Sequence, residues 1–367
     1  MRRPSSDEVL ESLQDLIDRS SDGDRLPTVR DLMRDHRVSQ AAVTAALDTL
    51  RGEGLVSSHV GRGSYVVKRE GRAASGPMPR TLLILSNASM NERGVMVQNR
   101  LVEAMAVEGG KVVQISYHDT DQLLSILGST PRFDATILQS HFESIPVRLL
   151  ALLKAKSRAL VADGHSISGI DVDRVGTDWE EALDMAVSRL AGLGHQRIAL
   201  ISADIDAQPI LSARRAFTRV ARAAGIAAEH ARGIVLPGMT HPNQRVADGL
   251  ERALRDIMEG SGGRLPFTGA ILLGQSDGAG LREGLTRLGL CAPEDLSVCL
   301  LGHRDVPSEH QEVLTMAGST ASEAATALLA TLRRRLEDPG APPRIVFLGV
   351  DEAVRASVAE QPAFRAE

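Results

Sequence analysis

Residues 26–66 read LPTVRDLMRDHRVSQAAVTAALDTLRGEGLVSSHVGRGSYV, and they carry most of the folding information in the first part of the chain. Thr28 is a good N-cap for a helix over VRDLMRDH, and Ser39 for a second helix over QAAVTAALDTLRGEG. The second helix has one apolar face, made by Val43, Ala46, Leu47 and Leu50. Residues 55–56 and 64–67 then predict two short strands on either side of a glycine-containing tip at 60–63.

One more helix precedes this stretch. Val9, Leu13, Leu16 and Ile17 recur at helical spacing, which predicts an amphipathic helix over about residues 7–20. The order helix, helix, turn, helix, hairpin is typical of a winged helix-turn-helix, whose third helix enters the major groove of DNA. Each feature has a simpler explanation when taken alone, since a serine caps many helices and glycines form many turns. The ordered combination favours DNA binding.

The distribution of charge gives modest support. The whole chain has a net charge of −5, which at first sight argues against a nucleic-acid partner. Position matters more than the total. Most acids of the first segment precede residue 36, and the stretch 36–69 holds only Asp48 and Glu53 against several basic residues: Arg37, Arg51, Arg62, Lys68 and Arg69.

The same segment resembles the GntR family of bacterial transcription regulators. Its pattern, which runs roughly LPSERELAxxxxVSRTTVRxALxxLxxEGLVxxxxGRGTFV, is matched in one ungapped register by Leu26, Pro27, Arg30, Leu32, Val38, Ser39, Val43, Ala46, Leu47, Leu50, Glu53, Gly54, Leu55, Val56, Gly61, Arg62, Gly63 and Val66. The resemblance implies DNA contacts from the second helix, from the start of the third helix and from the wing. The predicted DNA-binding residues are Arg30, Ser39, Gln40, Ala41, Thr44, His59, Gly61, Arg62 and Gly63.

The third helix departs from the family pattern. Where the family usually places two arginines, this chain has Gln40 and Thr44, with Ala41 and Ala42 between them. Glutamine can pair with adenine, and alanine can pack on the thymine methyl group. We therefore expect a weaker grip on phosphate and an operator sequence that cannot be carried over from the family.

The remaining sequence predicts an α/β fold. A winged helix-turn-helix over 1–67 is followed by a linker, residues 68–80, that is rich in Gly, Ala, Ser and Pro and lacks periodicity. Short apolar runs then alternate with helical patterns, which predicts doubly wound parallel sheets in two lobes. The runs lie at 81–85, 112–115, 135–138, 159–161, 198–201, 270–273 and 298–301.

Residues 81–358 show a second resemblance. The segments VGTDWEEALDMAVSRLAGLGHQRIALIS (175–202), FTGAILLGQSDGAGLREGLTRLGLCAPEDLSVCLLGHRD (267–305) and VRAS (354–357) are similar to landmarks of the LacI/GalR regulators. The resemblance implies a two-lobed fold of the periplasmic-binding-protein type I over 81–360, with crossovers near 177, 304 and 319. We expect lobe 1 at about 81–176 and 305–319, and lobe 2 at about 177–304 and 320–360.

A ligand cleft is expected where the strands end, because loops at the carboxyl ends of parallel strands line such sites. Polar residues in these loops are the candidates, and the resemblance adds Asp178, which matches the family aspartate at the junction of the lobes. The predicted effector-binding residues are Asn87, Asn91, Gln139, Asp178, Trp179, Arg214, Gln275 and Arg304. The simpler explanation for any one of them is a solvated loop residue.

The cleft departs from the sugar-binding pattern of the family. The family arginine falls on Ala213, with Arg214 next to it, and the family Asn-Asp pair falls on Gly274-Gln275. Arg304 stands where the family has an acid. A cleft with fewer carboxylates and an added arginine favours an anionic effector, such as a sugar phosphate or sugar acid, over a neutral sugar. An equally open alternative is a cleft that has drifted and binds nothing tightly.

Other classes of protein are not supported. The start, MRRPSSDEVL, lacks the apolar run of a signal peptide, and no stretch is apolar enough to cross a membrane. Two cysteines and scattered histidines predict neither disulfides nor a metal site, and no nucleophile elbow or phosphate loop indicates an enzyme or a cofactor. We expect a cytoplasmic, nucleoid-associated protein.

The sequence therefore predicts a ligand-responsive regulator of transcription, a repressor of genes for carbohydrate or related metabolism. Its expected partners are a double-stranded DNA operator, a small-molecule effector and a second copy of itself, since paired readers fit a two-fold operator. The alternative is a small-molecule binding protein whose DNA-binding or effector site has degenerated.

Overall fold

The computed structural model describes most of the chain, in these ranges: 6–20, 26–36, 38–52, 56–59, 63–66, 76–87, 91–139, 145–165, 171–240, 245–274 and 277–361. The chain divides into two compact units, Met1–Ala74 and Ser75–Glu367, which we describe separately. The division falls inside the segment predicted as a linker, residues 68–80.

The first unit has the predicted order of elements. Three helices precede a two-stranded antiparallel hairpin: α1 (Ser6–Arg19), α2 (Val29–His36), α3 (Gln40–Gly52), β1 (Val56–His59) and β2 (Gly63–Val66). The backbone N–H of Leu26 donates to the carbonyl of Ser64 at 2.8 Å, which ties the start of α2 to the hairpin. This is a winged helix-turn-helix, so the prediction for this unit is confirmed.

The helices of this unit begin where the sequence placed their caps. The hydroxyl of Thr28 accepts from the N–H of Asp31 at 3.3 Å, and the Asp31 carboxylate accepts from the Thr28 N–H at 3.3 Å. The Ser39 hydroxyl accepts from the N–H of Ala42 at 3.3 Å. The apolar faces of the helices and the hairpin meet in one small core: Val9, Leu13, Ile17, Leu26, Leu32, Val43, Ala46, Leu47, Leu50, Val56 and Val66.

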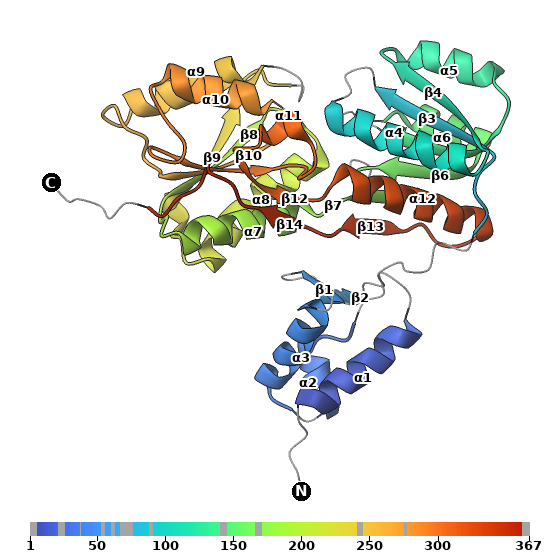
Figure 1. Cartoon of the computed structure of the whole chain (residues 1–367), viewed down its shortest axis with the longest axis horizontal. Helices are drawn as coiled ribbons and strands as arrows, with labels where there is room; N and C mark the ends of the chain where they lie inside the picture. Colours follow the sequence, from blue (N-terminus) through green and yellow to red (C-terminus); the bar gives the residue numbers. More distant parts are fainter. Residues whose placement is uncertain are drawn as a thin grey trace, which may run out of the picture. The chain divides into compact units, whose positions relative to one another are not determined.

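The second unit contains two six-stranded sheets, each the centre of one lobe (Figure 1). Lobe 1 has the strand order β13-β7-β6-β5-β3-β4, and all its strands are parallel. Its elements are β3 (Thr81–Asn87), α4 (Glu92–Val107), β4 (Lys111–Tyr117), α5 (Thr120–Ser129), β5 (Phe133–Gln139), α6 (Val147–Lys156), β6 (Ser157–Asp163), β7 (Asp173–Thr177), α12 (Ala321–Glu337) and β13 (Ile345–Leu348).

Lobe 2 repeats this arrangement with the order β14-β12-β11-β10-β8-β9, in which only β14 runs antiparallel to its neighbour. Its elements are α7 (Trp179–Gly192), β8 (Ile198–Ala203), α8 (Gln208–Ala223), η1 (Ala228–His230), β9 (Ala231–Leu236), α9 (Val246–Glu259), β10 (Gly269–Leu273), α10 (Gly278–Arg287), β11 (Ser297–Leu301), α11 (Pro307–His310), β12 (Thr315–Gly318) and β14 (Asp351–Ala353). The predicted two-lobed, doubly wound fold is confirmed.

Helices cover both faces of each sheet, which is why the central strands are apolar throughout. In lobe 1, α4 and α12 pack on one face, and α5 and α6 pack on the other. In lobe 2, α7 and α8 lie on the opposite side of the sheet from α9 and α10 (Figure 1). The strands β8, β10 and β11 are buried along their whole length.

The assignment of the last segments to the lobes was wrong in part. The prediction placed 305–319 in lobe 1 and 320–360 in lobe 2, whereas β12 pairs with β11 in lobe 2, and α12 and β13 pack in lobe 1. The chain crosses between the lobes after Thr177, after Gly318 and between Leu348 and Asp351, not near 304. The loop after β11 packs against lobe 1, but the chain then returns to β12 in lobe 2. The sequence prediction took this contact for a crossover.

No helix among the described residues is long and apolar enough to span a membrane.

Candidate DNA interface and effector cleft

The exposed face of α3 carries two of the residues predicted to read DNA. Gln40 and Thr44 are exposed and one helical turn apart, while Val43, Ala46 and Leu47 between and beside them are buried in the core. Ser39 is also exposed, although its hydroxyl caps the helix. The first two turns of α3 therefore present short polar side chains to solvent, as a helix that enters a groove requires.

The other predicted DNA contacts are only partly described. Arg30 lies in α2 and Ala41 in α3, and His59 pairs with Gly63 as the last register pair before the tip of the wing. Gly61 and Arg62 lie outside the described residues. All nine predicted DNA-binding residues remain predictions about contact with DNA.

In lobe 1, a buried polar network lies where two strands end. Asp163 is the last residue of β6, and its carboxylate accepts two bonds from the Arg93 guanidinium, at 2.6 and 2.8 Å. Gln139, the last residue of β5, donates to Asp163 at 3.0 Å and accepts from Gln98 at 2.8 Å. These side chains are 7% exposed or less, so the network forms a preorganised polar floor at the end of the sheet that meets lobe 2.

Only Gln139 of this network was predicted. Arg93 and Gln98 lie on the buried face of α4 with Val97, Leu101 and Met105. Arg93 is a charged residue on a helix face that is otherwise mostly apolar, and this pattern could have indicated a buried polar site. Asp163 directly follows a buried apolar strand, which was a second signal. Their pairing joins positions far apart in the sequence, and no local pattern reveals it.

The other predicted residues of lobe 1 lie nearby. Asn91 caps α4, and its side-chain oxygen accepts from the N–H of Gly94 at 3.0 Å. Asn87 is the last residue of β3. His165 follows β6 and contacts the carbonyl of Gly176 at 3.0 Å and the ring of Phe347 with centroids 4.5 Å apart. Burial lowers the pKa of His165 to about 4, so this ring is neutral at physiological pH.

At the junction of the lobes, Asp178 and Trp179 begin α7. Asp178 is 4% exposed, and its carboxylate accepts from the backbone N–H groups of Glu180 and Glu181 at 3.0 and 3.2 Å. Trp179 meets the ring of His303 edge to face, with centroids 5.5 Å apart. Asp178 therefore caps the helix that leaves the first crossover, and Trp179 contacts the loop after β11.

Arg304 lies between the lobes, in the loop after β11. Its Nε donates to the carbonyl of Gly318 at 2.8 Å, and its Nη2 lies 3.3 Å from the carboxylate of Glu323 at the start of α12. Because the guanidinium already has a carboxylate neighbour, the argument for an anionic effector that rested on Arg304 loses its main observation. The sequence alone could not show that this arginine has partners on the second crossover.

The whole segment Gly302–His310, which we call the strap, connects lobe 2 to lobe 1. Val306 is fully buried in the core cluster of lobe 1, and the Asp305 carboxylate caps α12 by accepting from Ala321 and Ser322 at 2.8 and 3.2 Å. The N–H of Ser308 donates to Glu92 of α4 at 2.9 Å. A movement of one lobe against the other must therefore move or break the strap.

Within the strap, contacts between a buried carboxylate and His303 fix the loop beside Trp179. Glu309 is 4% exposed and accepts from the backbone N–H of His303 at 2.6 Å and contacts its ring Nδ1 at 3.0 Å. Nearby, the hydroxyls of Thr177 and Ser319 are 2.6 Å apart and join the first crossover to the second. None of these residues was predicted as part of the site.

The remaining predicted residues come from lobe 2. Arg214 of α8 donates to the hydroxyl of Ser202 at 2.8 Å and to the carbonyl of Ala203, at the end of β8. These partners are neutral, so its charge is not compensated by them. Gln275 lies outside the described residues. The seven predicted effector residues that the structure describes are thus divided between the two lobes and the strap, and the contact of all eight with a ligand remains a prediction.

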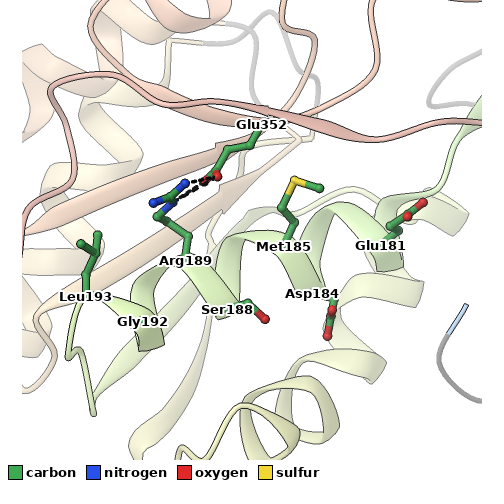
Figure 2. A pocket seen from close by; sticks show the side chains of 8 residues that line it. All are labelled: Glu181, Asp184, Met185, Ser188, Arg189, Gly192, Leu193 and Glu352. Atoms are coloured by element: carbon green, nitrogen blue, oxygen red, sulfur yellow. Dashed lines mark hydrogen bonds and ion pairs between the residues drawn. The ribbon is translucent and has the colours of Figure 1, made fainter. Parts of the chain in front are cut away.

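A separate groove runs along the outward side of α7 (Figure 2). The Arg189 guanidinium and the Glu352 carboxylate cross it, with bonds of 2.6 to 3.1 Å that tie α7 to β14 of the third crossover. The groove is lined by Glu181, Asp184, Met185, Ser188, Arg189, Gly192, Leu193 and Glu352. Burial raises the pKa of Asp184 in this groove. In the part of the chain that is described, no set of three or more His, Cys, Asp or Glu side chains could hold a metal ion.

Comparisons with known proteins divide the chain in the same way. Residues 5–66 match the model of the bacterial regulatory proteins of the gntR family, and residues 187–358 match that of a periplasmic binding protein-like domain. The chain therefore joins a segment that matches the gntR family model to a part that matches a periplasmic binding protein-like domain. No curated protein gives a significant match.

Solved structures support the fold of the second part. A LacI family transcriptional regulator from Enterococcus faecium with bound ribose is 18% identical, with a TM-score of 0.63 over 77% of this chain and 100% of that one. A LacI transcriptional regulator from a Rhodococcus species is 19% identical, with a TM-score of 0.62 over 77% of this chain and 99% of that one. A regulator from Weissella paramesenteroides with bound sucrose is 17% identical, with a TM-score of 0.58 over 77% of this chain and 100% of that one.

Proposed function

We propose that this protein is a repressor that binds a DNA operator as a homodimer and responds to a carbohydrate or a close derivative of one. The observation that carries the proposal is the union, in one chain, of a GntR-type reader and a two-lobed binding fold. Two of the regulators that are similar in structure hold ribose and sucrose, which supports a sugar-like effector. We propose no catalysis, no cofactor and a place of action on cytoplasmic nucleoid DNA.

The effector would bind between the lobes, over the polar floor of Arg93, Gln139 and Asp163. Binding between two lobes stabilises the arrangement of lobes that contacts the ligand on both sides. The strap and the crossovers would transmit this change, because Val306, Asp305 and Arg304 of lobe 2 are bound to groups of lobe 1 or of the crossover that leads into it. Affinity for DNA then depends on effector concentration.

The charge of the effector is a separate question. Among the described residues, the partners of the Arg214 guanidinium are a hydroxyl and a carbonyl, so it can still attract a carboxylate or phosphate. Arg93 has a carboxylate partner and offers no such attraction. We therefore propose testing neutral pentoses and disaccharides beside their phosphates and acids.

Mapping the genomic positions bound by the full-length protein tests this function most economically. The expected result is a small set of discrete sites with an inverted repeat, upstream of genes for uptake or breakdown of one class of sugar. Calorimetry with the substrates of those genes then identifies the effector, and the fluorescence of Trp179, the single tryptophan, should respond to it. Binding spread evenly over the genome would contradict the proposal.

A further inference from the structure

A basic residue stands at or beside the first residue of every strand in the sheet of lobe 1. These residues are Arg80 before β3, Lys111 in β4, Arg132 before β5, Lys156 and Arg158 around the start of β6, Arg174 in β7 and Arg344 before β13. Because all six strands are parallel, their amino ends lie along one edge of the sheet. We call these residues the basic edge.

Some of these cations donate hydrogen bonds to neutral backbone carbonyls, which do not neutralise their charge. Arg132 donates to the carbonyl of Ala155 at 3.0 Å, and Lys156 donates to the carbonyls of Gly128 and Thr130. Arg80, Lys111, Arg132 and Arg158 are exposed to solvent. The four exposed residues therefore present positive charge at this edge, and Arg158 also lies 3.6 Å from a carboxylate.

Two carboxylates along this edge are already engaged. Asp134 accepts from the N–H groups of Arg80 and Thr81 at 2.9 and 3.1 Å, and lies 3.6 Å from Arg158. Asp173 is buried and is bound by Arg335 at 2.7 and 3.0 Å. Exposed acids such as Glu108 and Asp171 do not outnumber the cations.

Lobe 2 provides an internal comparison, because its sheet repeats the same topology. Arg197 precedes β8, but Thr268 precedes β10, and Asp295 and Glu312 stand shortly before β11 and β12. Arg232 is the second residue of β9, so the corresponding edge of lobe 2 has mixed charge, with bases at two strand starts and acids before two others. Basic strand starts are a property of lobe 1 and not of the fold in general.

The basic edge lies at the end of lobe 1 where the chain enters this lobe. The strands of lobe 1 run from this edge toward lobe 2, since β7 ends at Thr177 just before the first crossover. The chain enters lobe 1 here, because the carbonyl of Gly76 accepts from Arg333 at 2.8 Å and Arg80 leads into β3. Residues 67–75, which separate Gly76 from β2, span at most ~30 Å when fully extended.

We propose that the basic edge of lobe 1 binds the phosphate backbone of duplex DNA beside the half-site read by the winged domain. This inference depends on the proposed function, because it requires that the winged domain is bound to DNA. Phosphate contacts of this kind add affinity without adding sequence information. They would offset the weaker grip expected of an α3 that has Gln40 and Thr44 in place of arginines.

The test replaces three exposed residues of the edge in the full-length protein, as Arg80→Gln/Lys111→Gln/Arg158→Gln. The matched control, Arg215→Gln/Arg222→Gln/Arg232→Gln, removes the same charge from exposed positions of lobe 2. Affinity for a duplex of ~60 bp is measured by fluorescence anisotropy between ~50 and ~200 mM salt. A third protein, Arg80→Lys/Arg158→Lys, keeps the charge and controls for folding.

We expect the edge variant to bind ~10-fold or more weakly at the lower salt, where the loss of phosphate contacts costs most, with the slope of log affinity against log salt reduced by roughly 2–3. The control and the lysine variant should match the wild type. Equal behaviour of the edge variant and the lobe 2 control would overturn the inference while leaving the proposed function intact. A wild-type protein that binds no duplex would overturn both.

Discussion

At the scale of single residues, Gln40 is the predicted DNA contact that gives the most specific test. It is exposed at the start of α3, and a glutamine can make paired bonds to adenine. We expect Gln40→Ala to lose roughly 1–3 kcal/mol of discrimination at one base pair, with little change in affinity for random DNA. Competition assays with operator variants measure this. Thr49→Ala, an exposed position two turns farther along α3, is the control, and an equal effect of both changes would contradict our placement of the interface.

The pair Arg93–Asp163 is the residue-scale test of the lobe 1 floor. Removing one partner of a buried ion pair leaves an uncompensated charge, so Arg93→Met should lower the free energy of unfolding by about 3–5 kcal/mol. The double variant Arg93→Met/Asp163→Leu should lose less than the sum of the two single changes, because it leaves no unpaired charge. Denaturant unfolding followed by Trp179 fluorescence measures all four proteins. Additive effects would show that the pair is not coupled.

His165 gives a pH dependence of defined sign. Its pKa falls from 6.5 to about 4 on folding because burial disfavours the charged ring. The unfolded chain therefore binds the proton first, and stability is lost as the pH falls from about 6.5 toward 4. His165→Gln should flatten the free energy of unfolding against pH in this window, by up to a few kcal/mol. An unchanged pH profile in the variant would contradict the burial of this ring.

At the scale of secondary structure, the sequence predicted the strands that helices cover on both sides. Apolar runs identified β3, β5, β6, β8, β10 and β11, which are buried along most of their length. The run at 112–115 also identified β4, although this edge strand is largely exposed. The strands β7, β9, β12, β13 and β14 were not identified. β9, β13 and β14 lie at sheet edges with one side exposed, and β12 is a short run that contains alanine and glycine. Such strands depend on their neighbours more than on their own composition.

The sequence predicted those residues of the candidate site whose position depends on one loop or strand end. The polar strand ends Asn87 and Gln139 follow from local patterns, and Asp178 follows from the resemblance to the LacI/GalR regulators. The strap does not, because Arg304 and Val306 acquire their partners only when the second crossover brings α12 beside the loop after β11. Contacts between lobes join segments whose patterns are independent of one another.

The strap gives the element-scale prediction. Val306 is fully buried in the core of lobe 1, so Val306→Ala should cost roughly 1–3 kcal/mol of stability by leaving a cavity there. It should also weaken the response of DNA affinity to the effector, because one of the links between lobes is lost. Thermal unfolding and operator titrations measure the two effects. Val354→Ala, which is 56% exposed, is the control, and equal results for both would show that the strap carries no coupling.

At the scale of the whole molecule, the two lobes are connected by three crossovers of the chain and by the contacts of the strap. The winged domain contributes a reading helix with few charges, and lobe 1 contributes a basic edge where the chain enters it. A two-fold operator requires two readers, so light scattering should give the mass of a dimer at concentrations where operator binding is measured. A monomer that binds a full operator would contradict this part of the account.

The most direct test of the central claim is the affinity of the full-length protein for its mapped operator, measured with and without the effector found by calorimetry. We predict a change of roughly 5- to 150-fold, the usual range for coupling between two sites, and an equal and reciprocal effect of the operator on effector affinity. An operator affinity that stays constant at saturating effector would contradict the claim that effector binding to the two lobes controls DNA binding by this protein.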